Sequence, residues 1–143
     1  MSEDTMSMIT GACLCGEVSF EVHGGFSEAS LCHCSICRRA TGSGFGAYGE
    51  VKESHLVWRQ GKALLREYRV SNLLRKFFCS KCGSTIATHH QSWPDYYYLS
   101  LGCLDGNPDV DIEYHQFVDS KASWVKIDDG LTQFSEWPED DSS

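Results

Sequence analysis

Apolar and polar side chains alternate along much of the chain, which is the pattern of strands that bury one face. The clearest case is residues 17–23, where Val18, Phe20 and Val22 alternate with polar side chains. Stretches rich in Val, Tyr, Phe and Trp predict further strands at residues 45–49, 56–60, 64–70, 75–79, 85–89, 96–103, 112–118 and 123–127. The pattern therefore predicts an all-β or mainly β fold.

One short helix is predicted over Ser35 to Thr41, with Gly42 as its stop. We find no linker rich in Pro or Ser and no repeat between the two ends of the chain. The expected organisation is a single domain of residues 9–135. A flexible tail of residues 1–8 would precede it, and an acidic flexible tail of residues 136–143 would follow it.

The formal net charge of −8 lies mostly in acidic residues near the two ends, which leaves the rest of the chain close to neutral. No basic patch of the kind that nucleic acid requires is visible. The first residues lack the positive charge and apolar run of a signal peptide, and the most apolar window, residues 96–104, is too short to span a bilayer. We therefore expect a cytoplasmic protein that binds neither nucleic acid nor membranes. Its thiols would stay reduced.

Seven of the eight cysteines fall in three tight clusters. The clusters are Cys13 with Cys15, then Cys32, Cys34 and Cys37, then Cys79 with Cys82. A C-x-x-C turn brings two sulfurs within reach of one ion, about 2.3 Å from each. Four sulfurs close a tetrahedral zinc site and three leave one position open, so seven cysteines suggest one site of each kind. Spacing alone does not say which clusters combine, and a rubredoxin-like iron site is the alternative to zinc.

These clusters lie in longer segments that resemble a known family. The segments are residues 11–18, 32–43, 78–84, 101–105 and 122–124, and together they span most of residues 9–137. Their sequence is similar to that of the glutathione-dependent formaldehyde-activating enzyme family, which also includes centromere protein V. The resemblance implies a β-tent zinc fold of curved antiparallel sheets with one or two short helices.

The resemblance also implies an assignment of the metal ligands and an activity. Cys13, Cys15, Cys79 and Cys82 would share a closed structural zinc, while Cys32, Cys34 and Cys37 would hold a second, catalytic zinc with an open position. The implied activity is that of a carbon–sulfur lyase that makes or breaks S-hydroxymethylglutathione, with glutathione and formaldehyde as partners. A thiol entering the open position would lose its proton, because zinc stabilises the thiolate, which then attacks the aldehyde carbon.

Two arginines and the eighth cysteine are further candidates. Arg38 and Arg39 directly follow the three-cysteine cluster, and either could bind a substrate carboxylate or lie on a solvated helix face. Cys103 is expected to be a small buried apolar residue, with a fourth ligand of the second site as the alternative.

The histidines are weaker candidates as ligands. His33 stands between two expected ligands and is predicted to point away from the metal. His89, His90 and His115 are expected to be ordinary strand residues.

Two other functions remain open at this stage. A non-enzymatic zinc scaffold would need Cys103 or a histidine to complete the second site. A redox switch would form disulfides within the clusters and release the metal.

Overall fold

The computed structural model describes residues 8–138, so residues 1–7 and 139–143, which make up most of the two predicted tails, lie outside the described part. The strands of the described part form two sheets, accompanied by one α-helix and short 3-10 turns. The predicted mainly β fold is therefore confirmed. In the described residues, no helix is both long and apolar enough to cross a membrane.

The chain groups into two compact units, Met1–Ser27 with Gly49–Val110 and Glu28–Tyr48 with Asp111–Ser143. The single domain of residues 9–135 stays a prediction, and each unit is described by itself below.

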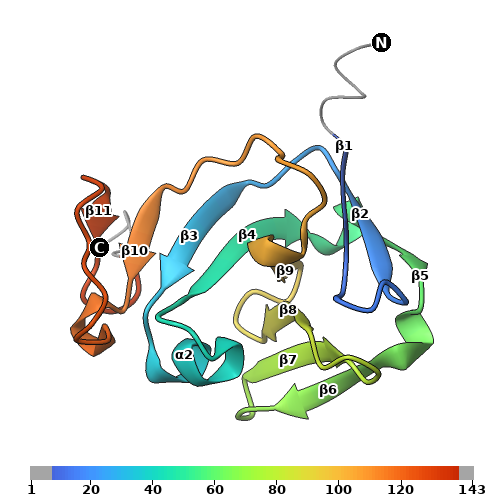
Figure 1. Cartoon of the computed structure of the whole chain (residues 1–143), viewed down its shortest axis with the longest axis horizontal. Coiled ribbons are helices and arrows are strands. Elements are labelled where there is room, and N and C mark those ends of the chain that lie inside the picture. Colours follow the sequence, from blue (N-terminus) through green and yellow to red (C-terminus); the bar gives the residue numbers. More distant parts are fainter. Residues whose placement is uncertain (1–7, 139–143) are drawn as a thin grey trace. The chain divides into compact units, whose positions relative to one another are not determined.

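The smaller sheet lies in the first unit. It pairs β1 (Met8–Ala12) with β2 (Ser19–His23), and β2 with β5 (Leu56–Gln60), in antiparallel fashion (Figure 1). The apolar side chains of β2 face inward, as their alternation predicts, and Phe20 packs edge-on against Trp58 with 5.9 Å between ring centroids. The turn between β1 and β2 carries Cys13 and Cys15.

The rest of the first unit is a second run of strands. The order is β4 (Gly46–Lys52), β9 (Tyr96–Ser100), β8 (Thr85–His90), β7 (Leu74–Cys79) and β6 (Leu65–Arg69), with the residues of β4 from Gly49 onward belonging to this unit. The last four of these pair antiparallel. Three 3-10 turns lie in this unit, at Glu53–His55, Lys62–Leu64 and Leu101–Cys103. Its core is apolar, with Val18, Phe20, Val22, Ile86, Ala87 and Leu99 fully buried.

The second unit places a helix beside a short run of strands. Its strands are, in order, β11 (Thr132–Gln133), β10 (Tyr114–Gln116), β3 (Glu28–Cys32) and the first residues of β4. The α-helix α2 (Ser35–Thr41) follows β3, and a 3-10 turn, Val118–Ser120, follows β10 (Figure 1). Strand β10 pairs in parallel with both β3 and β11, so the expected antiparallel arrangement does not extend to this edge.

The helix and most strands match the sequence predictions, but four segments do not. The predictions missed β1, β3 and β11, and residues 123–127, predicted as a strand, form none. Strand β3 contains Ala29 and Ser30, which carry little β propensity, and it is stabilised by its ladder with β10. Residues 123–127 have strand-like side chains but no partner strand in the described part, and Lys121 donates from its amine to the carbonyl of Val125 instead.

Candidate metal centres

A cluster of four cysteines, called the first cluster from here on, joins two turns of the first unit. Cys13 and Cys15 lie after β1, Cys79 ends β7, and Cys82 lies in the turn before β8. Their four sulfurs all lie within 4.8 Å of one another, with 3.5 Å from Cys13 to Cys15 and 3.8 Å from Cys15 to Cys79. Four sulfurs this close are the donor set of a closed tetrahedral zinc site.

Hydrogen-bond donors surround these sulfurs. The backbone amide of Val18 donates to Cys13 Sγ at 3.3 Å and that of Lys81 to Cys79 Sγ at 3.4 Å. The Ser84 hydroxyl lies 3.3 Å from Cys82 Sγ, and this contact, with the amides of Ser84 and Cys15, lowers the pKa of Cys82 to about 5. Donors that favour the thiolate fit a metal site, because thiolate is the form that binds a metal.

The second cluster lies where β3 leads into α2. Cys32 ends the strand, Cys34 is the N-cap of the helix, and Cys37 lies in its first turn. The three sulfurs lie within 4.8 Å of one another, and within the described residues no further histidine, cysteine or carboxylate belongs to the group. The donor set therefore fits a metal that keeps one position for another ligand.

Local hydrogen bonds make the three sulfurs unequal. The thiols of Cys32 and Cys37 and the backbone amide of Cys37 stabilise the Cys34 thiolate and lower its pKa to about 2. For Cys32 the effect is the opposite: its contacts with the thiols of Cys34 and Cys37 raise its pKa. The Cys34 thiol therefore ionises more readily than the Cys32 thiol.

A tyrosine contacts the remaining sulfur. The hydroxyl of Tyr48, on β4, donates to Cys37 Sγ at 3.1 Å, and both residues are buried. Burial, followed by the nearby charge of Cys37, raises the pKa of Tyr48. The hydroxyl consequently keeps its proton and acts as a donor. No pattern in the sequence predicts this contact, since Tyr48 resembles any other aromatic residue in a strand.

A row of two buried histidines and an exposed carboxylate lies in the same unit. Asp129 Oδ2 is 2.8 Å from His115 Nε2, and His115 Nδ1 is 2.9 Å from His33 Nε2. Because the carboxylate accepts from His115, His115 in turn accepts from His33, which leaves His33 Nδ1 as a bare acceptor. That nitrogen is buried and has no hydrogen-bond partner in the described part. The side chain of His33 is fully buried, and neither His33 nor His115 belongs to a group of residues that could hold a metal ion.

The other predicted residues have mixed positions. Arg39 is exposed, whereas the Nε of half-buried Arg38 is enclosed and has no hydrogen-bond partner among residues 8–138. Cys103 belongs to neither cluster, and its thiol lies 3.9 Å from the carbonyl of Thr85 in the first unit. Burial raises the pKa of the Cys103 thiol, as expected of a cysteine in apolar surroundings.

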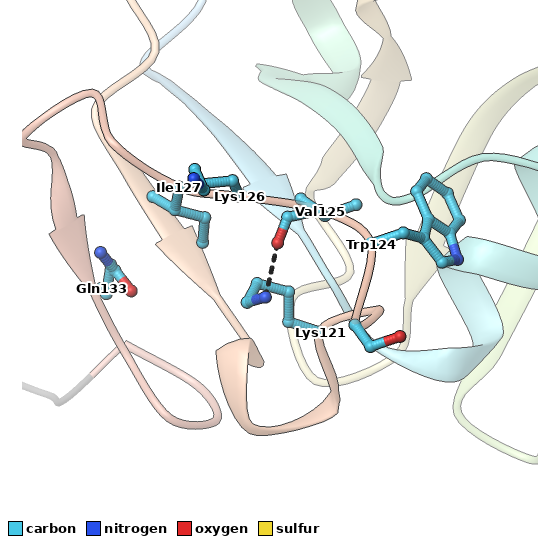
Figure 2. Close-up of a pocket in the computed structure, with 7 residues that line it drawn as sticks. Lys121, Trp124, Val125, Lys126, Ile127 and Gln133 are labelled. Carbon is cyan, nitrogen blue, oxygen red and sulfur yellow. Dashed lines mark hydrogen bonds between the residues drawn. The ribbon is translucent and has the colours of Figure 1, made fainter.

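Residues 123–127, which were wrongly predicted to form a strand, form the wall of an open cavity in the second unit. The cavity has a volume of about 420 Å³ and is lined by Lys121, Ser123, Trp124, Val125, Lys126, Ile127 and Gln133 (Figure 2). The Lys121 amine is engaged with the Val125 carbonyl, as the dashed line in Figure 2 shows. A side chain at Gly44, just beyond α2, would meet Trp124 and Val125, so this wall packs against the loop that ends the helix.

The fold and the two clusters define a class of protein: a mainly β chain with one set of four and one set of three cysteines, each close enough together to hold a metal ion. The family model of the glutathione-dependent formaldehyde-activating enzyme matches residues 8–120. The chain therefore belongs to the glutathione-dependent formaldehyde-activating enzyme family.

Individual relatives are distant. A Halomonas elongata protein, provisionally named a glutathione-dependent formaldehyde-activating enzyme, is 25% identical over 128 residues, which cover 85% of this chain and 82% of the relative. An uncharacterised lyase of Schizosaccharomyces pombe is 22% identical over 125 residues, with 87% and 89% covered. A crystal structure of a Rhodobacter sphaeroides protein matches with a TM-score of 0.59 and 30% identity, covering 71% of this chain and 96% of that one.

Proposed function

We propose that the protein is a zinc-dependent carbon–sulfur lyase that forms or cleaves a small thiol–aldehyde adduct such as S-hydroxymethylglutathione. The observation that carries this proposal is the division of seven cysteines into a set of four and a set of three. A closed set has no position for a substrate, whereas a set of three has one. Family membership and the relative named as a lyase support the same reaction class.

In this proposal the two clusters have different tasks. Cys13, Cys15, Cys79 and Cys82 hold a structural zinc, and Cys32, Cys34 and Cys37 hold the reactive one. Zinc at the second site would supply stabilisation of thiolate at neutral pH. The chain itself presents the three sulfurs, with the Cys37 amide and the Tyr48 hydroxyl donating to two of them.

The arginines at the helix supply positive charge for the same substrate. Arg38 and Arg39 directly follow Cys37, and the enclosed Nε of Arg38 lacks a hydrogen-bond partner in the described residues. A guanidinium group suits a carboxylate, which glutathione carries at both ends. We therefore propose that these arginines bind the carboxylates of the thiol substrate.

The scaffold alternative is less well supported by the geometry. It requires Cys103 or a histidine as a fourth ligand of the second cluster. Cys103 lies beside Thr85 in the first unit, and His33 and His115 hydrogen-bond to one another. The redox alternative predicts disulfides within each cluster, which mass spectrometry under mild oxidation would detect.

The test combines metal analysis with an exchange assay. Elemental analysis should find about two zinc ions per chain, and NMR exchange spectroscopy should show faster interconversion of glutathione and S-hydroxymethylglutathione than without protein. Cys34→Ser should abolish the acceleration, and Cys103→Ser, which alters a cysteine outside both clusters, should retain it. A protein with two zinc ions and no acceleration would contradict the proposed reaction.

A further inference from the structure

The side-chain hydroxyl of Tyr48 contacts a sulfur of the three-cysteine cluster. Its oxygen lies 3.1 Å from Cys37 Sγ, and the two residues are only 7% and 6% exposed. Water therefore has little access to this contact. Within residues 8–138, no side-chain hydroxyl donates in this way to Cys32 or Cys34.

A glycine on strand β4 leaves room for the Tyr48 side chain that makes this contact. Gly46 lies two residues before Tyr48 on β4, so both face the same side of the sheet. A Cβ at Gly46 would overlap the ring and hydroxyl of Tyr48, because those atoms occupy the space where a side chain would begin. The absence of a side chain at position 46 therefore gives the tyrosine its place.

A hydrogen bond to a thiolate draws charge from the sulfur. The thiolate becomes a weaker base and a weaker nucleophile, since nucleophilicity falls together with pKa. A donor that is worth one to two pKa units would slow attack about three- to tenfold at a Brønsted slope of about 0.4–0.5.

We infer that Tyr48 is a positioning residue that acts through Cys37 and makes that sulfur less nucleophilic than it would be without the hydroxyl donor. The sulfurs of Cys32 and Cys34 would then donate a larger share of the electron density that reaches a bound metal. Cys37 would react more slowly with electrophiles such as aldehydes. This inference rests on the cluster being a thiolate site, as in the proposed function, but it does not require lyase activity.

The test is alkylation of the purified protein by iodoacetamide at alkaline pH, followed by peptide mass mapping. Tyr48→Phe should raise the ratio of Cys37 to Cys32 alkylation about three- to tenfold. The matched control is Tyr114→Phe, which removes a hydroxyl bonded to Glu28 in the same unit and should leave the ratio unchanged. Gly46→Ala displaces Tyr48 while keeping its hydroxyl and should act like Tyr48→Phe.

A spectroscopic readout separates this role from simple packing. In the cobalt-substituted protein, Tyr48→Phe should move the thiolate-to-metal charge-transfer band to lower energy, because the sulfur donates more strongly. An unchanged ratio with an unchanged band would overturn the inference, as would equal increases at Cys32, Cys34 and Cys37, which would mean that the cluster had merely opened. If the wild-type protein lacks lyase activity but the ratio changes, only the proposed reaction fails.

Discussion

Single hydrogen bonds distinguish the cysteine sulfurs of this protein. Ser84 faces Cys82 in the four-cysteine cluster, and Tyr48 faces Cys37 in the three-cysteine cluster. Ser84 also accepts from the amide of Leu14 at 3.0 Å, so one hydroxyl links the two turns that carry the first cluster. Changes of one atom at these positions should therefore alter metal binding more than they alter the fold.

Ser84→Ala should release zinc from the first cluster at a higher pH than the wild type does. The Ser84 hydroxyl is the main cause of the lowered pKa of Cys82, so its loss raises that pKa and lets protons compete better with the metal. The measurement is zinc release against pH with a colorimetric chelator. Ser80→Ala, an exposed serine in the same turn, is the control and should leave the curve in place. Identical curves for both variants would contradict the role of Ser84.

Asp129→Asn should lower the melting temperature at neutral pH and have little effect in acid. The amide of Leu131, followed by the side chain of His115, lowers the pKa of Asp129 below its ordinary value of 3.8. A depressed folded-state pKa means that the carboxylate stabilises the fold above the ordinary value, and that this contribution is lost as pH falls through the folded value.

Thermal melts at neutral and at strongly acid pH test this dependence. Asp128→Asn changes an exposed neighbouring carboxylate and should behave like the wild type at both. An equal loss of stability for Asp129→Asn at the two pH values would show that its charge is not involved.

At the scale of the elements, the clusters lie where strands end. Helix α2 begins at a cysteine cap and ends at Gly42, whose φ of 65° is in the left-handed region. Gly61 follows β5 with a φ of 79°. The two glycines share this backbone conformation but differ in surroundings: a Cβ at Gly42 would meet nothing within 4 Å, and one at Gly61 would overlap the backbone of Glu17 and Val18.

Gly61→Ala should therefore destabilise the protein more than Gly42→Ala. The change at Gly42 should cost about 1 kcal/mol from the left-handed conformation alone. The change at Gly61 adds a backbone overlap that no side-chain rotation can relieve, for a total of about 3 kcal/mol or more. Urea unfolding of the two variants measures the difference. Equal losses would mean that the backbone at Glu17 and Val18, just before β2, yields to the added methyl group.

At the scale of the whole molecule, the two clusters tie together very different lengths of chain. Cys15 and Cys79 stand 64 residues apart, whereas the second cluster lies within one strand end and one helix turn. Closing a long loop removes more entropy from the unfolded chain than closing a short one. The four-cysteine site should consequently contribute most of the metal-dependent stability.

Cys82→Ser should lower the melting temperature much more than Cys34→Ser. Loss of the metal link between these distant segments should lower the melting temperature by at least about 10 °C, because structural zinc binding is coupled to folding. Differential scanning calorimetry with and without chelator measures this effect, and chelator should bring the wild type close to Cys82→Ser. A larger loss for Cys34→Ser would mean that the second cluster is the structural one.

Local patterns in the sequence predicted the elements whose causes are local. The helix over Ser35 to Thr41 follows from its own residues and the Gly42 stop, and its predicted bounds agree with the structure. The alternation around Phe20 predicted β2, because a strand that buries one face shows this in its own side chains. The cysteine spacing suggested a division into four and three, and the structure brings the sulfurs together in groups of that size, but which clusters combine was implied only by the family resemblance.

Only the tertiary structure decided what depends on distant partners. Strand β3 exists through its ladder with β10, and residues 123–127 form no strand although their side chains favour one. The row from Asp129 through His115 to His33, and the hydroxyl of Tyr48 on Cys37, join residues that no spacing relates. The physical reason is that strand pairing and buried hydrogen bonds are set by which segments meet in space, and a single sequence does not state that directly.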